Sequence, residues 1–348
     1  MSKNSILPQA VPYLDTIEIT DPNANSNFPH NQAKKSTFDF EKFTILSQVQ
    51  TTEKEIVNNF QDRKLKSLTL SETYNILGLD KRSKKVEECG SFLEFKINPA
   101  ETKLFHANFC KDRFCPMCNW RRSMKIFGQV QQIVDKIKDN YEFLFLTLTV
   151  KNCSASDLAY TIDQMYNGFR YLYNKNKVFK TSFKGTFRNL EITYNRVRHD
   201  FHPHFHIVIA VEKNYFKSKD YLKQSDIVKL WRKALNVDYD PIVYIEKVLK
   251  TGKGLSGVVA EVAKYMTKDI EYICNPYILS SYLSALPSHR RLTSMTGIIK
   301  RTAKQLSFDD CETGDLIHTD NNNSPAYLGV IVRCVWNSNK YILSYSDL

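Results

Sequence analysis

Hydrophobic and polar positions follow a strand-like pattern through the middle of the chain. Residues 141–150 (YEFLFLTLTV) form an apolar run with the length and composition of a buried strand. Residues 185–193 and 204–211 alternate at a period of two, and the polar connector 194–203 joins them. We expect an antiparallel hairpin here, with a further strand at 241–249.

The flanking segments have a helical spacing of apolar positions instead. The helices predicted from this spacing lie at about 39–85, 156–173, 225–235, 257–270 and 277–285. Proline, asparagine and serine interrupt any period over roughly the first 35 residues, which predicts a loose arm. The chain is therefore predicted to be an α+β protein with a central antiparallel β-sheet and flanking helices.

The same pattern divides the chain into four parts. We expect a flexible arm and a helical region over 1–85, followed by a cysteine-rich segment over 86–125. Residues 139–306 contain the predicted sheet. Residues 307–348 contain an acidic, asparagine-rich linker and a last hairpin at 327–345.

Composition adds a basic surplus to this picture. The 348 residues include 49 Lys and Arg against 37 Asp and Glu, a formal net charge of +12 with a pI near 9.1. This surplus favours nucleic acid as a partner over a membrane, and the alternative is a merely soluble basic protein. Because no apolar stretch reaches the roughly 18 residues of a membrane span and no signal peptide is recognisable, we expect a cytoplasmic protein without a membrane partner.

The segment HPHFH is the sharpest local feature. On a strand, His204 and His206 point to the same face, and Glu191 on the neighbouring predicted strand can place a carboxylate beside them. Two imidazoles and one carboxylate suit a cation such as Mn²⁺ or Mg²⁺ that keeps positions open for phosphate oxygens. His202 shares this face, and we expect it to support the site without binding the metal. The alternative is that the histidines are structural.

A predicted helix places three reactive side chains on one stripe. Glu261, Tyr265 and Lys268 are spaced i, i+4, i+7. A phenol is a weak nucleophile at its free pKa of ~10, and a metal on the scissile phosphate with a lysine nearby would make its attack feasible. Glu261 is placed to activate a water or a second hydroxyl. The alternative is an ordinary Glu/Lys helix with a tyrosine at its edge.

Three cysteines have the spacing of a structural zinc site. Cys110, Cys115 and Cys118 need a fourth ligand to close a tetrahedron, for which Cys89 is the first choice and His106 the alternative. The surrounding basic side chains suggest that this zinc knuckle helps to hold DNA, although a role as a staple of the fold is equally compatible. These candidate DNA contacts are Arg113, Arg121 and Arg122.

The order of three motifs resembles that of the HUH endonucleases. The motifs are the strand FLTLT at 145–149, HPHFH at 202–206 and YMTK at 265–268. More closely, the chain is similar to plasmid rolling-circle replication initiators (Rep proteins) of the subgroup that pairs one tyrosine with a glutamate. The resemblance covers about 86–320.

The resemblance implies a palm-like or ferredoxin-like sheet domain over 139–306 that nicks DNA. Tyr265 would attack origin DNA that is single-stranded or extruded as a hairpin, forming a 5′-phosphotyrosine and freeing a 3′-OH primer. Glu261 would assist the terminating cleavage, and Lys264 is a further candidate DNA contact. A host helicase and DNA polymerase are implied as partners. The competing functions are a zinc-containing DNA-binding regulator without nuclease activity and a single-tyrosine HUH transposase.

Overall fold

The computed structural model describes residues 51, 53–54, 56–98, 101–248, 254–263, 269–319 and 330–345. The predicted arm over the first 35 residues lies outside these ranges. No helix among the described residues is both long enough and apolar enough to cross a membrane.

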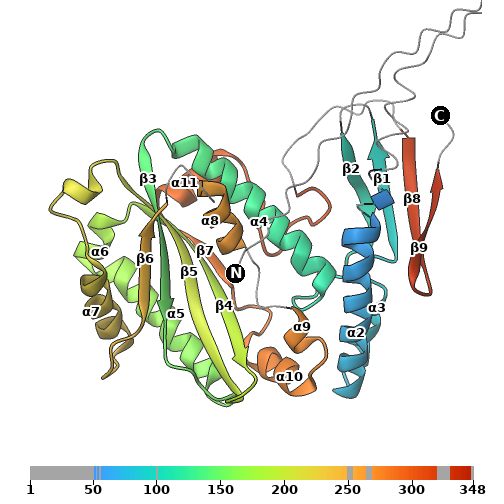
Figure 1. Cartoon of the computed structure of the whole chain (residues 1–348), viewed down its shortest axis with the longest axis horizontal. Helices are drawn as coiled ribbons and strands as arrows, with labels where there is room; N and C mark the ends of the chain where they lie inside the picture. The colour runs from blue at the N-terminus through green and yellow to red at the C-terminus, as the bar shows by residue number, and fades with distance from the viewer. Residues whose placement is uncertain are drawn as a thin grey trace, which may run out of the picture. The chain divides into compact units, whose positions relative to one another are not determined.

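Within the described ranges, five antiparallel strands form a central sheet in the order β6-β3-β5-β4-β7 (Figure 1). Its strands are β3 (Tyr141–Thr149), β4 (Gly185–Asn195), β5 (Asp200–Glu212), β6 (Val243–Lys247) and β7 (Thr293–Met295). The predicted hairpin is β4–β5, and its turn is closed by the Asn195 side chain, which accepts hydrogen bonds from two backbone N–H groups of the turn. The α+β class with a central antiparallel sheet is confirmed.

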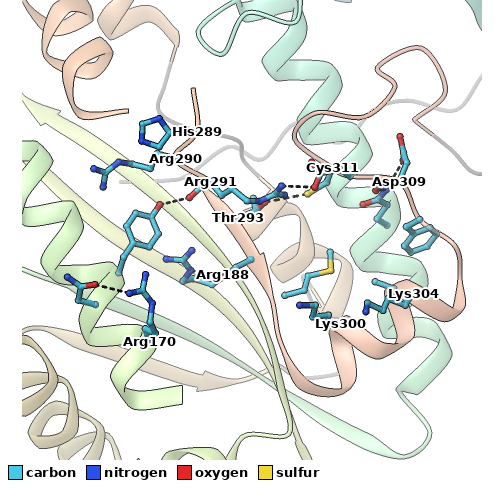
Figure 2. Close-up of a pocket in the computed structure, with 18 of the residues that line it drawn as sticks. Arg170, Arg188, His289, Arg290, Arg291, Thr293, Lys300, Lys304, Asp309 and Cys311 are labelled. Carbon is cyan, nitrogen blue, oxygen red and sulfur yellow. Dashed lines mark hydrogen bonds and ion pairs between the residues drawn. The ribbon is translucent and has the colours of Figure 1, made fainter. Parts of the chain in front are cut away.

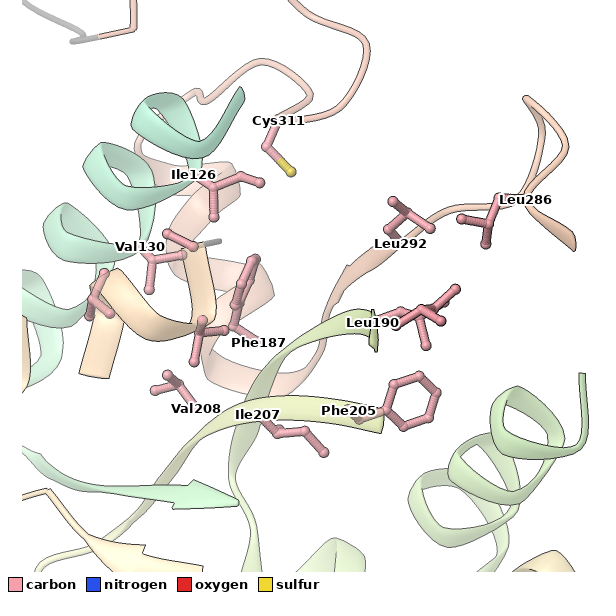
Figure 3. Packing of buried hydrophobic residues seen from close by; sticks show 14 of the residues in the cluster. Ile126, Val130, Phe187, Leu190, Phe205, Ile207, Val208, Leu286, Leu292 and Cys311 are labelled. Atoms are coloured by element: carbon pink, nitrogen blue, oxygen red, sulfur yellow. The ribbon is translucent and has the colours of Figure 1, made fainter. Parts of the chain in front are cut away.

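Helices cover both faces of this sheet. On one face, Phe205 of β5 packs against Phe169 and Trp231, with ring centroids 5.8 and 6.4 Å away. On the other face, Phe187 and Val208 lie among apolar side chains of α4 (Figure 3). The helices of the first face are α5 (Leu158–Lys175) and α7 (Gln224–Leu235), and those of the second are α4 (Pro116–Ile137), α8 (Gly254–Ala263) and α11 (Gly297–Gln305).

A second antiparallel sheet joins the cysteine-rich segment to the last described strands of the chain. In the described part of the chain its order is β2-β1-β8-β9. The strands are β1 (Phe92–Ile97), β2 (Thr102–Ala107), β8 (Val330–Asn337) and β9 (Lys340–Tyr345). Since β1 pairs with β8 along its whole length, the C-terminal hairpin is an integral part of this sheet.

The remaining elements are short or flank the second sheet. Helix α2 falls within the helical stretch expected over about 39–85, and α3 extends two residues past it. The helix expected over about 257–270 is described as α8 and α9, with 264–268 outside the described residues. These elements are η1 (Ile56–Gln61), α2 (Asp62–Ile76), α3 (Asp80–Glu87), α6 (Lys177–Ser182), η2 (Tyr215–Lys217), α9 (Asp269–Tyr272) and α10 (Pro276–Ala285).

Candidate functional site

The register of β4 and β5 brings the two predicted histidines and the predicted glutamate together. Glu191 pairs directly with His204 across the hairpin, and all three side chains lie on the same face of the sheet. The Glu191 Oε2 atom lies 3.0 Å from His206 Nε2 and 3.6 Å from His204 Nε2, and the two Nε2 atoms are 3.1 Å apart. These three ligand atoms are therefore close enough to bind one metal ion.

The other nitrogen of each imidazole contacts a neighbouring group. His204 Nδ1 lies 3.1 Å from the carbonyl oxygen of His202, so this nitrogen donates its proton and leaves Nε2 with a free lone pair. His206 Nδ1 lies 3.2 Å from the hydroxyl of Thr147 on β3. Contacts of this kind fix the tautomer and the ring orientation of a metal-binding histidine.

Ring contacts hold the same imidazoles from the side. The rings of His202 and His204 are stacked with centroids 5.3 Å apart, and Phe145 stacks on His206 at 5.4 Å. His202 thus contacts the histidine pair through its carbonyl and its ring, while its own nitrogens are not part of the three-residue cluster.

Glu191 is ionised at every physiological pH. Burial raises the pKa of its carboxyl, but the hydrogen bonds and charges of His204 and His206 outweigh burial and hold the pKa at about 2. The side chains of all three residues retain 11 to 13% of their exposure, so a bound ion would remain accessible from solvent. One carboxylate and two imidazoles form a donor set that fits Mn²⁺ well and Mg²⁺ with additional oxygen ligands.

Helix α8 packs on the same face of the sheet as this cluster. The Asn189 side-chain amide, two residues before Glu191 on β4, donates a hydrogen bond to the carbonyl of Val262 at 3.1 Å. Glu261 is half-buried in the last turn of α8. The predicted nucleophile Tyr265 lies outside the described residues, as do Lys264 and Lys268.

The cysteine cluster forms the second candidate metal site. The Sγ atoms of Cys110 and Cys89 each lie 3.6 Å from Cys118 Sγ, and Cys115 Sγ lies 3.6 Å from Cys89 Sγ. Zinc–sulfur bonds of about 2.3 Å in a tetrahedron require sulfur separations of about 3.8 Å, which the cluster matches closely. All four cysteines are buried.

The backbone around the cluster is arranged to stabilise thiolates. Backbone N–H groups of Cys110, Lys111 and Asp112 donate to sulfur atoms at 3.2 to 3.4 Å. The residue after Cys89 is Gly90 and the residue after Cys110 is Lys111, and both have positive φ (66° and 59°). The turn at Cys110–Asp112 supplies all three N–H groups to the sulfurs, so the donor set and its surroundings fit a structural Zn²⁺.

His106, the alternative fourth ligand, lies outside the sulfur cluster. Its Nδ1 atom is 3.2 Å from Glu94 Oε2 on the neighbouring strand β1, and its side chain is 61% exposed. Arg333 of β8 donates to the other oxygen of Glu94 at 2.7 Å. The structure therefore brings Cys89, and not His106, to the other three cysteines.

The arginines near the cysteines bond to the protein itself. Arg121 and Arg122 are 6% and 3% exposed, and they donate to carbonyl oxygens of residues 312–317. Arg113 donates to the carbonyls of Leu286, Pro287 and Ser288. This placement favours a structural role for the three arginines over the DNA contacts expected from the sequence.

Two residues that position the site were not among the sequence candidates. Thr147 contacts the ring of His206, and Asn189 joins the histidine face to α8. Thr147 lies two residues before Thr149 on β3, and Asn189 lies two residues before Glu191 on β4, so each pair points to the same face of the sheet. The period of two could have pointed to them once the strand register was known.

Comparisons with known proteins agree on one family. A family model described as "Replication protein" (Rep_1) matches residues 101–342. A protein named "Protein rep" from Streptococcus pneumoniae serotype 2 is 38% identical over 290 residues, which cover 81% of this chain and 90% of that protein. A "Protein rep" from Lentilactobacillus hilgardii is 34% identical over 313 residues, 85% of this chain and 97% of that protein. No solved structure matches the chain significantly.

Proposed function

Since the chain belongs to the Rep_1 family of replication proteins, we propose that it initiates rolling-circle replication of a plasmid by nicking one strand of the origin DNA. The observation that carries this proposal is the cluster of Glu191, His204 and His206 on one face of the central sheet. A reaction on plasmid DNA assigns the protein to the cytoplasm, and the net charge of +12 suits a polyanionic substrate.

The cluster would hold the scissile phosphate through a divalent cation, Mn²⁺ or Mg²⁺. Such an ion acts as a Lewis acid that polarises a phosphoryl oxygen. The contacts of Thr147 and the His202 carbonyl then keep both Nε2 atoms directed at one point. The ionised Glu191 supplies the negative charge that an isolated pair of imidazoles lacks.

Tyr265 is the proposed nucleophile. Its phenolic oxygen forms a bond to phosphorus while the bond from phosphorus to the 3′-oxygen breaks. The phenolic proton is lost and the leaving 3′-oxygen gains one, which yields a 5′-phosphotyrosine and a free 3′-OH primer. Because one phosphodiester is exchanged for another, no nucleotide cofactor is needed. Lys264 and Lys268 would contact the DNA and the developing charge near this tyrosine.

Glu261 is the proposed base for the terminating step. Its place in the last turn of α8, a helix that Asn189 ties to the metal face, supports this role. By accepting a proton from water, it would allow the second cleavage to end without a further covalent adduct. A host helicase and DNA polymerase would then extend and displace the strand.

The cysteine cluster has a structural role in this proposal. A Zn²⁺ held by Cys89, Cys110, Cys115 and Cys118 would join the turn between α3 and β1, the loop after β2 and the start of α4. This would fix the start of α4 against the turns that flank β1 and β2 of the second sheet, because Cys115 and Cys118 lie at the first turn of that helix.

The test is a covalent-adduct assay. Full-length protein and Mn²⁺ are incubated with labelled single-stranded oligonucleotides that tile the origin, and label that migrates with denatured protein is measured. We expect an adduct that Tyr265→Phe and His206→Ala abolish, with DNA affinity nearly unchanged in Tyr265→Phe. His199→Ala is the matched control, because His199 lies in the β4–β5 turn and contacts Tyr194 instead of the cluster. Tight binding without an adduct under any metal would instead indicate a DNA-binding regulator.

A further inference from the structure

A basic cavity lies along the edge strand β7, apart from both candidate metal sites. Its volume is about 810 Å³, and it extends from α5 past β7 to α11 (Figure 2). Its positively charged lining residues are Arg170, Arg188, Arg290, Arg291, Lys300 and Lys304.

The acidic residues of the cavity do not neutralise all of this charge. Asp163 pairs with Arg290 at 2.8 Å, Asp310 pairs with Arg291 at 2.7 Å, and Asp309 pairs with Lys125 of α4. In the described part of the chain, no carboxylate lies within ion-pair distance of the remaining cavity cations. These cations are Arg170, Arg188, Lys300 and Lys304.

Arg188 is the central group of the cavity. It is only 4% exposed, and its guanidinium lies 4.4 Å from the ring centroids of both Tyr166 and Phe205. Its Nε donates to Ser294 Oγ at 3.0 Å, whereas its Nη1 is buried without a hydrogen-bond partner among the described residues. The Nε atom of Arg290 is in the same situation. Buried, unpaired guanidinium N–H groups are costly, so a bound anion would compensate them.

The shape and chemistry of the cavity favour a phosphate group. A planar guanidinium presents donors that match the oxygens of a phosphate, and Lys300 and Lys304 add exposed ammonium groups one helical turn apart on α11. Arg188 lies three residues before Glu191 on β4 but points to the opposite face of the sheet. Three residues of strand span roughly 10 Å. A DNA strand that passes round β7 can therefore reach both the metal face and the cavity.

We propose that this cavity is a second phosphate-binding site, which holds a backbone phosphate of the DNA outside the scissile position. The choice of DNA as the phosphate source rests on the proposed function; the anion site itself does not. Arg188 and Arg290 would bind the phosphate at the base of the cavity, and Lys300 and Lys304 would hold the adjoining backbone at its mouth.

The first experiment measures the anion site alone. Thermal unfolding of the full chain is followed with increasing inorganic phosphate at constant ionic strength, with chloride as the reference salt. We expect phosphate to raise Tm in the wild type, and Arg188→Met to lose this rise. If Arg188→Met does not fold, the double variant Lys300→Gln/Lys304→Gln, altered only at exposed positions, is expected to reduce the rise. Equal Tm in phosphate and chloride for the wild type would overturn the proposal.

The second experiment identifies the source of the phosphate. Affinity for a single-stranded origin oligonucleotide is measured against salt concentration. Each lost phosphate contact should lower the slope of log K against log salt by about 0.7. We expect this loss and a several-fold weaker affinity in Lys300→Gln/Lys304→Gln. Arg301→Gln is the matched control, since Arg301 is an exposed cation of the same helix that does not line the cavity. If phosphate raises Tm but Lys300→Gln/Lys304→Gln binds DNA as well as Arg301→Gln does, DNA is not the source of the phosphate. The natural ligand of the cavity would then be a small free anion.

The two proposals fail separately. His206→Ala should lose the covalent adduct and keep the phosphate-dependent rise in Tm, which would support a separate site. Loss of that rise in His206→Ala would mean that phosphate binds at the metal face and would overturn the second site. A wild type that never forms an adduct but still responds to phosphate would remove the nicking function and leave the anion site standing.

Discussion

The side-chain amide of Asn189 donates to the carbonyl of Val262 at 3.1 Å and so ties β4 to the last turn of α8. Asn189 is buried, with 1% of its surface exposed, and lies on the same face as Glu191 two residues later. The candidate general base Glu261 is the neighbour of Val262 in sequence. This contact therefore joins a helix end to the strand that carries Glu191 of the metal cluster.

Replacing Asn189 by Ala should slow adduct formation more than it weakens DNA or metal binding. We expect a roughly 10- to 100-fold lower rate, because small displacements of a nucleophile are costly in rate. Loss of the buried hydrogen bond should also lower the free energy of unfolding by about 1–3 kcal/mol. Single-turnover kinetics at saturating DNA and Mn²⁺ measure the first effect, and urea unfolding the second.

The control for this variant is Asn152→Ala, which removes an exposed hydrogen bond from the Asn152 side-chain amide to Asp200. Its nicking rate should equal that of the wild type. Equal rates in Asn189→Ala and Asn152→Ala would show that α8 is positioned without Asn189.

Thr147→Val should weaken binding of Mn²⁺ at the cluster of Glu191, His204 and His206. The hydroxyl of Thr147 lies 3.2 Å from His206 Nδ1, and removal of such an orienting partner typically costs 10- to 100-fold in metal affinity. Titration of the full chain with Mn²⁺, followed by calorimetry, gives the dissociation constant. Thr149→Val is the comparison, because the Thr149 hydroxyl donates to the Ile242 carbonyl at 2.9 Å instead of bonding a histidine nitrogen. A larger loss of Mn²⁺ affinity in Thr149→Val would contradict the role given to Thr147.

Cys118→Ser should release one zinc per chain and lower the thermal stability strongly. Cys118 Sγ lies within 3.6 Å of two other sulfurs and accepts a hydrogen bond from the Lys111 N–H, so it is central to the cluster. Because metal binding and folding are coupled at such sites, we expect a loss of several kcal/mol. Metal content by mass spectrometry and Tm by calorimetry are the readouts.

The matched variant for the zinc prediction is Cys274→Ser, at an exposed cysteine outside the cluster. It should keep its zinc and its Tm. If Cys118→Ser also keeps a full zinc complement, the four-cysteine assignment is wrong.

The ion pair between Asp310 and Arg291 should stabilise the fold above about pH 4 and lose this effect in acid. Burial raises the pKa of Asp310, but the hydrogen bonds from Arg291 and from nearby backbone N–H groups outweigh it and hold the pKa at about 2. The pKa of an aspartate in an unfolded chain is ~3.9. Because the folded pKa is the lower one, the contribution is complete above the unfolded value and disappears as pH falls toward 2.

Urea unfolding of the wild type and of Asp310→Asn between pH 6 and 2 measures this effect. The wild type should be the more stable protein at pH 6, and the difference should shrink steadily below pH 4. A difference that is independent of pH would show that the carboxylate charge of Asp310 does not contribute.

Local periodicity predicted the part of the site that lies within one hairpin. The alternation along 204–211 placed His204 and His206 on one face, and the expected hairpin put Glu191 on the neighbouring strand, where it pairs with His204. These relationships depend on residues close in sequence. The choice between Cys89 and His106 could not be made in this way, because it depends on how β1 and β2 pair.

Long-range packing explains what the sequence did not reveal. Arg121 and Arg122 are of a residue type that often contacts nucleic acid. Their guanidinium groups nevertheless donate hydrogen bonds to carbonyl oxygens nearly 200 residues away in sequence. The cavity beside β7 is likewise assembled from α4, α5, β4, β7, α11 and the loop after α11. No pattern along the chain relates these segments before the fold is known.

The pairing of β1 with β8 also constrains how the protein is made. Strand β1 ends at Ile97 and its partner begins at Val330, so the ribosome must add more than two hundred residues between them. At translation rates of about 5–20 residues per second, the edge of β1 that pairs with β8 stays unpaired for roughly 10–50 s. During that interval an unpaired strand edge can join another chain. Messages or fragments that end before β8 should therefore yield aggregating protein, even though the central sheet is complete.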